Sequence, residues 1–442
     1  MGAGTFVTQR FNAFNQRAPF DVTLLACMIT LIIFGLLMLF SASWDFSLSA
    51  YGDAMYMFDR QLIWLAIGLT LTALFAFFDY HRWHKLVVPL MAATIAMLLV
   101  VLFVNEIRFG AKRAFFAGSA QPSELAKLVA ILYLSVWLYA KQEYLADVSL
   151  GLIPLGTILG VVGGLIYQQP DLSAAATVII LGGLLFFLAG GDLKQIGGLL
   201  VVAIIAAWLV SSISLTGRER VNDFVAGIKD PLQASYHVRR SFEAIVNGGW
   251  FGAGLGQSRA KLTGLPVPPT DSVFAVVAEE LGLFGAIILI GLYAALVWRG
   301  LVIAQRAPDL LGFLLASGLS VWIGFEALLN MAVMVGLLPF AGNALPFVSA
   351  GGSNLVVTLA ALGVLFNISR QKGVVPTVGR SVNPIYNNDV KRAWVVRPTN
   401  SIFNRLHNAS KNIGWRSYSA VVNLRGRNGR RSLSRARRSR KV

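Results

Sequence analysis

LPVPPTDSVFAVVAEELG, residues 265–282, is the stretch that decides how this chain folds. A proline-rich run, which favours a loop over a helix, ends at Thr270 and Asp271, and a continuous apolar stretch begins directly after it. That apolar stretch carries two adjacent carboxylates, Glu279 and Glu280. Ionisable groups are costly in hydrocarbon, so an acid at the mouth of a membrane helix and two more inside it are candidate functional residues.

The surrounding composition is that of a polytopic membrane protein. The chain is 56% hydrophobic and only 13% charged, whereas a soluble domain usually has about 25% charged residues. Its one cysteine, Cys27, excludes an internal disulfide.

Apolar runs of the length needed to cross a bilayer, roughly 20 residues, recur along the chain. Backbone groups must be hydrogen-bonded within lipid, so we expect these runs to be helices. The predicted fold is therefore an all-α polytopic membrane protein with about ten transmembrane helices and a large outer loop, 215–273, between helices 7 and 8. The short QQPD turn between runs five and six also allows a partly re-entrant hairpin there. The ten runs lie near 23–43, 61–78, 86–104, 123–140, 150–168, 172–189, 196–214, 274–298, 311–335 and 352–369.

The placement of Lys and Arg in short loops predicts the orientation, because cytoplasmic loops carry the excess. With the N-terminus inside, residues 1–22 form a cytoplasmic segment, 23–370 the membrane domain and 371–442 a cytoplasmic tail. The inner set is then Arg10, Arg17, Arg82, Lys85, Lys141, Lys194, Arg299 and Arg306. The short outer loops carry only Arg60, Arg108, Lys112 and Arg113.

The tail holds most of the chain's net charge of +17. Residues 372–442 contain 17 Lys or Arg and one acid, Asp389, which gives +16 and leaves +1 for residues 1–371. Its Arg, Asn and Ser content predicts disorder. We expect the tail to bind anionic membrane lipids. An inert solvated extension has nearly equal support, and contact with nucleic acid is the weakest alternative, since a basic tail binds any polyanion.

The outer loop is basic and rich in glycine. Arginine donates bidentately to phosphate, and glycine allows a ligand to approach the backbone closely. One interpretation is a site for an anionic substrate, such as a diphosphate, and the other is a solvated loop with glycine turns. The candidate binding residues are Arg218, Arg220 and Arg240, joined by Arg108, Lys112 and Arg113 of an earlier outer loop.

Asp271 has two interpretations. Thr270 or Asp271 could cap the following helix, or Asp271 could act as a general base at the boundary between water and lipid, where partial desolvation raises a carboxylate pKa.

Several other polar residues fall within or beside the apolar runs. Glu124 and Lys127, three residues apart, can form an ion pair. We expect Asp171 to cap a helix, and Glu326 and Asn330 to be hydrogen-bonding partners between helices. The sequence has neither a His/Cys metal signature nor a nucleotide-binding fingerprint.

Several separated motifs, in order, resemble the SEDS family (shape, elongation, division and sporulation), the group that contains RodA and FtsW. The resemblance covers about residues 20–370. The motifs are the turn at Phe78-Asp79-Tyr80, AKRAFF followed by QPSELAK (121–127), QQPDLSAA, RERVNDF with KDPLQASYHVRRS, LPVPPTDSVFAVVAEELG, and GLLPFAGNALPFVSAGGSNL (336–355).

The resemblance implies a peptidoglycan glycosyltransferase of the bacterial plasma membrane. Its substrate would be lipid II, an undecaprenyl-diphosphate-linked disaccharide pentapeptide, and its partner a class B penicillin-binding protein. The family's essential aspartate falls on Asp271, which would help to deprotonate the acceptor's GlcNAc 4-hydroxyl for attack on the donor's MurNAc C1. Binding residues would include Glu124, Lys127, Glu279 and Glu280, together with Ser349 and Ser353 of the last motif.

The expected reaction needs no nucleotide and no organic cofactor, and only a divalent cation, Mg²⁺ or Mn²⁺, is a candidate for offsetting the diphosphate charge. Two other functions remain open, a flippase for lipid-linked precursors and an inactive scaffold that recruits a penicillin-binding protein. The motifs do not distinguish division, elongation and sporulation, because the lysine typical of FtsW is Ala341 here.

Overall fold

The structure is a computed structural model that describes residues 20–103 and 121–371. Within these ranges it consists of helices and connecting turns, with no strand. This confirms the prediction of an all-α polytopic membrane protein. The candidate residues Arg108, Lys112 and Arg113, most of the N-terminal segment and the tail from Lys372 lie outside the described residues.

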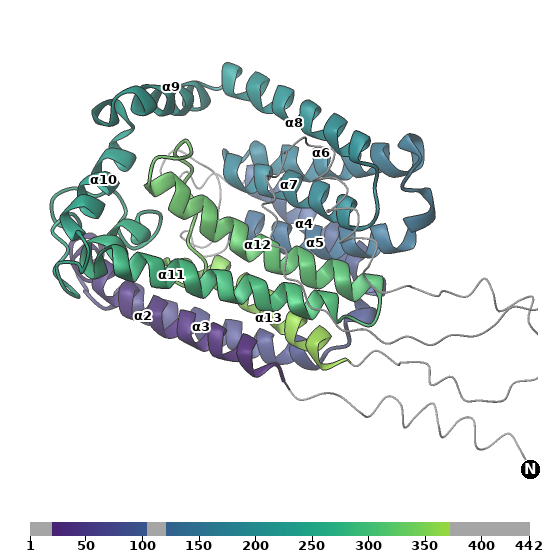
Figure 1. Ribbon diagram of the computed structural model, residues 1–442, viewed down its shortest axis with the longest axis horizontal. Coiled ribbons are helices and arrows are strands. Elements are labelled where there is room, and N and C mark those ends of the chain that lie inside the picture. Colours follow the sequence, from purple (N-terminus) through teal and green to yellow (C-terminus); the bar gives the residue numbers. More distant parts are fainter. Residues whose placement is uncertain (1–19, 104–120, 372–442) are drawn as a thin grey trace, which may run out of the picture. The chain divides into compact units, whose positions relative to one another are not determined.

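Each of the predicted apolar runs forms a helix (Figure 1). Eight spans are long and apolar enough to cross a membrane, while α7 and the apolar part of α8, Leu193–Ile205, are shorter. The ten helices are α2 (Val22–Tyr51), α3 (Tyr56–Phe77), α4 (Trp83–Phe103), α5 (Pro122–Ala140), α6 (Ile153–Tyr167), α7 (Leu172–Leu188), α8 (Leu193–Ile213), α11 (Val273–Gln305), α12 (Leu310–Met334) and α13 (Gly352–Arg370).

The segment predicted as an outer loop is itself largely helical. Helices α9 (Leu215–Lys229) and α10 (Tyr236–Gly248) occupy its first half, joined by the short turn Pro231–Gln233. The Ser214 side chain caps α9 by accepting a hydrogen bond from the backbone N–H of Gly217 at 3.2 Å. Residues 249–272 then lead to α11 without a further helix. Figure 1 shows α8, α9 and α10 leading in turn toward the start of α11.

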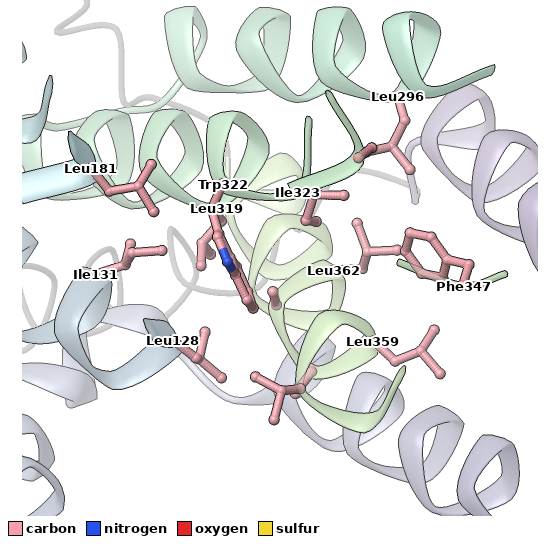
Figure 2. Close-up of a cluster of buried hydrophobic side chains, with 14 of the residues drawn as sticks. Leu128, Ile131, Leu181, Leu296, Leu319, Trp322, Ile323, Phe347, Leu359 and Leu362 are labelled. Carbon is pink, nitrogen blue, oxygen red and sulfur yellow. The ribbon is translucent and has the colours of Figure 1, made fainter. Parts of the chain in front are cut away.

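Helices α5, α12 and α13 form the buried centre of the membrane domain. More than 70% of the apolar window of each is buried inside the protein, whereas α3 and α4 are mostly exposed to the surroundings. Figure 2 shows the apolar centre, where Leu128 of α5, Leu181 of α7, Trp322 of α12 and Leu359 of α13 lie around one another. Polar side chains in this centre therefore have protein, not lipid or water, as their surroundings.

Helix α11 is broken at Gly282, although the sequence predicts an uninterrupted span. Gly282 has φ 70° and ψ −172°, values that no helix contains. The part after the break, Leu283–Gln305, is about 35 Å long at 1.5 Å per residue, which is sufficient to cross a hydrocarbon core of about 30 Å. The part before the break carries Glu279 and Glu280 and extends beyond that length toward Asp271.

The break frees backbone groups of α11, and the segment 249–254 supplies their partners. The Glu279 and Glu280 carbonyls accept from the N–H groups of Ala253 and Gly254 at 2.9 and 3.0 Å. Beyond the break, the N–H groups of Leu283 and Phe284 donate to the Gly249 and Trp250 carbonyls at 2.9 and 3.1 Å. The segment 249–254 is thus hydrogen-bonded into α11, which satisfies backbone N–H and carbonyl groups that would be costly to bury unpaired.

We predict that Gly252→Ala destabilises the protein far more than Gly256→Ala. Both glycines have positive φ, 82° and 79°, and a side chain there costs about 1–2 kcal/mol for backbone strain alone. At Gly252 a Cβ would also lie 2.1 Å from the Glu280 carbonyl oxygen, whereas at Gly256 it would meet no atom within 4 Å.

Thermal unfolding of the purified variants measures this difference. We expect the loss at Gly252 to exceed the loss at Gly256 by about 2 kcal/mol or more, because backbone cannot move aside as a side chain can. Equal losses would show that the segment 249–254 is not packed into the break.

Candidate active site

Asp271 lies where the loop 265–271 meets α11, and its side chain is half-buried. The N-cap position of α11 is Ser272, whose hydroxyl donates to the Pro266 carbonyl at 2.8 Å instead of capping the helix. The Thr270 hydroxyl donates backward to the Val267 carbonyl at 3.4 Å. Neither Ser272 nor the Thr270 hydroxyl therefore caps α11, and the capping interpretation of Asp271 stays a prediction.

Each of the last three backbone carbonyl groups before Ser272 accepts a hydrogen bond, which holds the backbone at the start of α11. All three donors come from α12 or from the segment 336–351, so a motif far away in the sequence fixes the position of Asp271. The three bonds are Ala350 N–H to the Pro269 oxygen at 2.7 Å, the Ser349 hydroxyl to the Thr270 oxygen at 2.6 Å, and the Asn330 amide to the Asp271 oxygen at 2.9 Å.

The Asp271 carboxylate lies against Gly342. A Cβ atom at Gly342 would be 2.9 Å from Oδ2 of Asp271, so any larger residue there would push the carboxylate aside. Strained backbone flanks this contact, because Val267 (φ 44°) and Phe347 (φ 68°) adopt left-handed conformations that side chains disfavour. Such strain costs of order 1–3 kcal/mol per residue and clusters at functional sites.

Lys127 of α5 is buried between two carboxylates. Its Nζ lies 2.9 Å from Oε1 of Glu124 and forms a second, short ion pair with Glu326 of α12. The exposed fractions are 1% for Lys127, 7% for Glu124 and 1% for Glu326, so water does not screen the pairs. The predicted pair of Glu124 and Lys127 is confirmed, and Glu326, expected as a hydrogen-bonding partner between helices, completes it.

The amide of Asn354 connects this cluster to α13. Its Nδ2 donates to Oε2 of Glu124 at 2.9 Å and to Oε2 of Glu326 at 3.3 Å. Three helices that form the buried centre, α5, α12 and α13, are therefore joined by one polar cluster, made of Glu124, Lys127, Glu326 and Asn354. We refer to it as the Lys127 cluster.

A short chain of hydrogen bonds made by asparagine amide groups links the Lys127 cluster to Asp271. The Asn343 side chain donates to the Glu326 carbonyl at 3.2 Å, and the Asn343 carbonyl accepts from the Asn330 side chain at 2.6 Å. The same Asn330 amide group donates to the Asp271 carbonyl. Displacing the cluster would therefore displace the Asn330 amide, which holds the backbone carbonyl of Asp271.

Glu279 and Glu280 are buried and hold residues 258–261, part of the predicted outer loop, against α11 and α2. Glu279 accepts from the Ser258 hydroxyl and from the N–H groups of Arg259 and Ala260, both at 3.1 Å at their shortest. Glu280 accepts from Ser41 of α2 at 2.6 Å and from Lys261 at 3.3 Å. Their exposed fractions are 1% and 0%, so substrate contact by these two carboxylates, predicted from the sequence, would require the segment to move.

The basic residues of the predicted outer loop, 215–273, have different contacts. Arg220 of α9 lies over the Phe340 ring at 5.8 Å, and His237 of α10 stacks on the same ring at 4.1 Å. Burial, together with the nearby Arg220, lowers the pKa of His237, so the positive charge beside Phe340 is that of Arg220. Because Phe340 is two residues from Gly342, the segment 340–342 contacts both a predicted binding arginine and Asp271.

The remaining predicted residues have local partners. Arg240 pairs with Glu243 at 2.6 Å and lies over Tyr236, and the Arg218 Nε donates to the Ser212 carbonyl. The Ser353 hydroxyl accepts from the Gln121 N–H at 2.9 Å beside the start of α5. Asp171 caps α7 as expected, with Oδ1 accepting from Ala174 N–H at 3.1 Å.

Sequence reasoning did not assign roles to Asn343, Asn354 or Gln61. Gln61 of α3 donates to the Ser349 carbonyl and accepts from Gly351 N–H, both at 3.3 Å, and so supports the segment that holds Asp271. The available signal was an amide side chain inside or beside an apolar run, which is costly unless it is hydrogen-bonded. The expectation of a divalent cation stays a prediction: the described residues contain no group of three His, Cys, Asp or Glu side chains placed to hold a metal ion.

Comparison with known proteins identifies the class of membrane protein to which this fold and site belong. Residues 21–373 match the FtsW/RodA/SpoVE family model, described as cell cycle protein. The chain belongs to this family, which confirms the resemblance carried by the motifs.

Individual relatives extend this result. The chain is 34% identical over 367 residues to the probable peptidoglycan glycosyltransferase FtsW of Trichlorobacter lovleyi, covering 82% of this chain and 96% of the relative. It is 36% identical over 379 residues to the protein of the same name from Legionella pneumophila, covering 82% and 96%. Stage V sporulation protein E of Bacillus subtilis is 34% identical, with 79% and 97% covered. The enzyme class predicted from the sequence, peptidoglycan glycosyltransferase, is thereby confirmed.

Solved structures agree with the fold. A chain from a study of how a peptidoglycan synthase complex coordinates polymerization and crosslinking superimposes with a TM-score of 0.66 at 30% identity, covering 79% of this chain and 98% of that one. The crystal structure of Thermus thermophilus RodA gives 0.60 at 28% identity, covering 80% and 97%.

We predict that Lys127→Met destabilises the protein by about 3–5 kcal/mol, because it leaves two buried carboxylates without their cation. Adding Glu124→Gln and Glu326→Gln should recover much of that loss. Thermal unfolding of the single and triple variants measures both effects. A mild single variant, or a triple variant that is worse than the sum of its parts, would contradict the cluster.

We predict that Asn330→Leu slows glycan polymerisation by about 10²-fold, the size of effect that a misplacement of about 1 Å can have. Asn367→Leu is the matched control: it removes an equally buried asparagine that bonds Tyr80 and Ala76 at the opposite helix ends. Both variants should lose stability, and polymerisation measured on equal amounts of folded protein should fall only for Asn330→Leu. A similar fall in both would remove the specific role of Asn330.

Proposed function

We propose that this protein polymerises glycan strands from lipid II at the outer face of the bacterial plasma membrane. The observation that carries the proposal is the fixed position of Asp271: its backbone carbonyl is held by Asn330, and its carboxylate lies against Gly342 at the mouth of α11. An acid held at a defined position can take up a proton from a bound hydroxyl group.

In the proposed reaction, the Asp271 carboxylate accepts the proton of the acceptor's GlcNAc 4-hydroxyl. The 4-oxygen attacks C1 of the donor's MurNAc and forms the new glycosidic bond. The bond from C1 to the diphosphate oxygen breaks, and undecaprenyl diphosphate leaves with the electron pair. The lipid carries the leaving group, so the reaction consumes no nucleotide.

Positive charge near Asp271 would stabilise the diphosphate as it leaves. Arg220 is the proposed arginine, because its Phe340 contact puts it beside the segment that touches Asp271. Arg108, Lys112 and Arg113 are proposed to contribute from the preceding outer loop. No step of the proposal depends on a metal ion.

A class B penicillin-binding protein is the proposed partner, supported by the likeness to a chain of a peptidoglycan synthase complex. Such a partner would crosslink the strands that this enzyme makes. The proposed orientation places both termini in the cytoplasm, with the basic tail against anionic lipids of the inner leaflet.

We predict that Asp271→Asn abolishes polymerisation of purified lipid II, with a loss of about 10²–10⁴-fold. Glu219→Gln is the matched control, because Glu219 is an exposed carboxylate of the same outer part of the chain. Product length on gels, with thermal unfolding as a check of folding, measures the effect.

The outcomes separate the candidate functions. Full activity of Asp271→Asn would remove the assigned base. A wild-type protein that makes no polymer, yet binds its penicillin-binding protein, would be a scaffold. Movement of lipid II between the two leaflets of a vesicle membrane, without polymerisation, would indicate a flippase.

A further inference from the structure

A pocket of about 350 Å³ lies at the ends of the helices farthest from Asp271. It is formed where α2 begins and where α11 and α13 end, so the pocket and the active site lie at opposite ends of α11. Three of its lining residues are charged, Asp21, Arg299 and Arg306. The predicted topology puts this end at the cytoplasmic surface.

The charges in the pocket do not balance. Asp21 accepts from Arg299 at two nitrogens, Nε at 2.9 Å and Nη2 at 2.7 Å, and also caps α2 through Leu24 N–H at 3.0 Å. Although burial alone would raise the pKa of Asp21, the bonds from Arg299 and Leu24 outweigh it and lower the pKa, so Asp21 is ionised. One arginine charge is thereby compensated and that of Arg306 is left over, which gives the pocket a net charge of +1.

Unused hydrogen-bond donors accompany this charge. An arginine has five N–H donors, and the Nη1 group of Arg299 has no acceptor among the residues that the structure describes. Ser369 and Gln371 also line the pocket, but the Ser369 hydroxyl donates to the Phe366 carbonyl and the Gln371 amide donates to Asp79, so the unused donors are those of Arg299 and Arg306. The pocket can therefore offer several donors to one anion with a single negative charge.

The rest of the lining is apolar, and the predicted topology puts it at headgroup depth. Val302, Ile303 and Ile368 are in the wall, on helices that continue into the membrane domain. Trp298, next to Arg299, is 62% exposed, and tryptophan is enriched at the membrane–water interface. A soluble anion would use only the charged part of such a pocket, whereas a phospholipid would use both parts.

We propose that this pocket binds the headgroup of one anionic phospholipid of the inner leaflet. The phosphodiester accepts from Arg299 and Arg306, and the glycerol and first methylenes lie against Val302, Ile303 and Ile368. One phosphodiester charge brings the net charge of the pocket to zero. Basic pockets between membrane helices at the cytoplasmic surface bind such headgroups.

The experiment uses the full chain in nanodiscs of phosphatidylcholine that contain a photoactivatable phosphatidylglycerol. Salt is kept at physiological strength in every arm, because Arg306 is an exposed residue whose charge high salt would screen. After irradiation, mass spectrometry maps and quantifies the crosslinked peptides. Arg306→Gln is the test variant and Arg306→Lys its conservative partner. Lys85→Gln is the matched control, because it removes one exposed charge at the same predicted surface.

We expect crosslinks at the ends of α11 and α13, and binding about fivefold weaker in Arg306→Gln, the effect of one basic residue near an anionic surface. Arg306→Lys should retain most of the binding and Lys85→Gln all of it. Equal losses in Arg306→Gln and Lys85→Gln would overturn the proposal, as would crosslinks spread evenly over the basic surface.

A competition arm separates the sources of phosphate. Inorganic phosphate or glycerol phosphate should leave the crosslinks unchanged, since neither carries the acyl methylenes that contact the apolar wall. Efficient competition by either would show a site for soluble phosphate and overturn the assignment to lipid. Thermal unfolding of Arg306→Gln in phosphatidylcholine alone should match the wild type, which shows that the variant is folded.

Discussion

The buried centre of this protein depends on a lysine held between two carboxylates. Lys127 cannot leave its place without exposing Glu124 and Glu326 to each other in a medium that screens charge poorly. Because the three residues, with Asn354, lie on α5, α12 and α13, their pairing fixes the relative positions of the helices in the buried centre. Catalysis by a positioned acid needs a rigid support of this kind.

The break of α11 at Gly282 solves a second problem, which is how to pack an irregular segment near the membrane surface. Non-helical backbone is tolerated there only when protein satisfies its hydrogen bonds. Segment 249–254 and the broken helix satisfy each other, and Glu279 and Glu280 bind the residues that follow. Two carboxylates that would be costly in lipid thus become anchors of the outer segment.

Local patterns predicted much of this structure, and the parts that were not predicted depend on partners distant in sequence. The apolar runs, the loop before Asp271 and the pair of Glu124 and Lys127 are properties of short stretches, and the structure contains them. The break at Gly282 could not be foreseen, because a glycine in an apolar run is compatible with a straight membrane helix and the hydrogen-bond partners at the break lie in the segment 249–254. Likewise, nothing near Asp271 in the sequence indicates that Asn330 and Ser349 hold its loop.

The central claim is that the Lys127 cluster positions Asp271 through the chain of hydrogen bonds made by Asn343 and Asn330. Hydrogen–deuterium exchange of the wild type and of Lys127→Met, in the same detergent, tests it most directly. The account predicts faster exchange in residues 266–275 and 341–351 together, with exchange in the distant helix ends around Asp79 and Asp309 unchanged. Unchanged exchange in 266–275, in a variant whose α5 and α12 exchange faster, would contradict it.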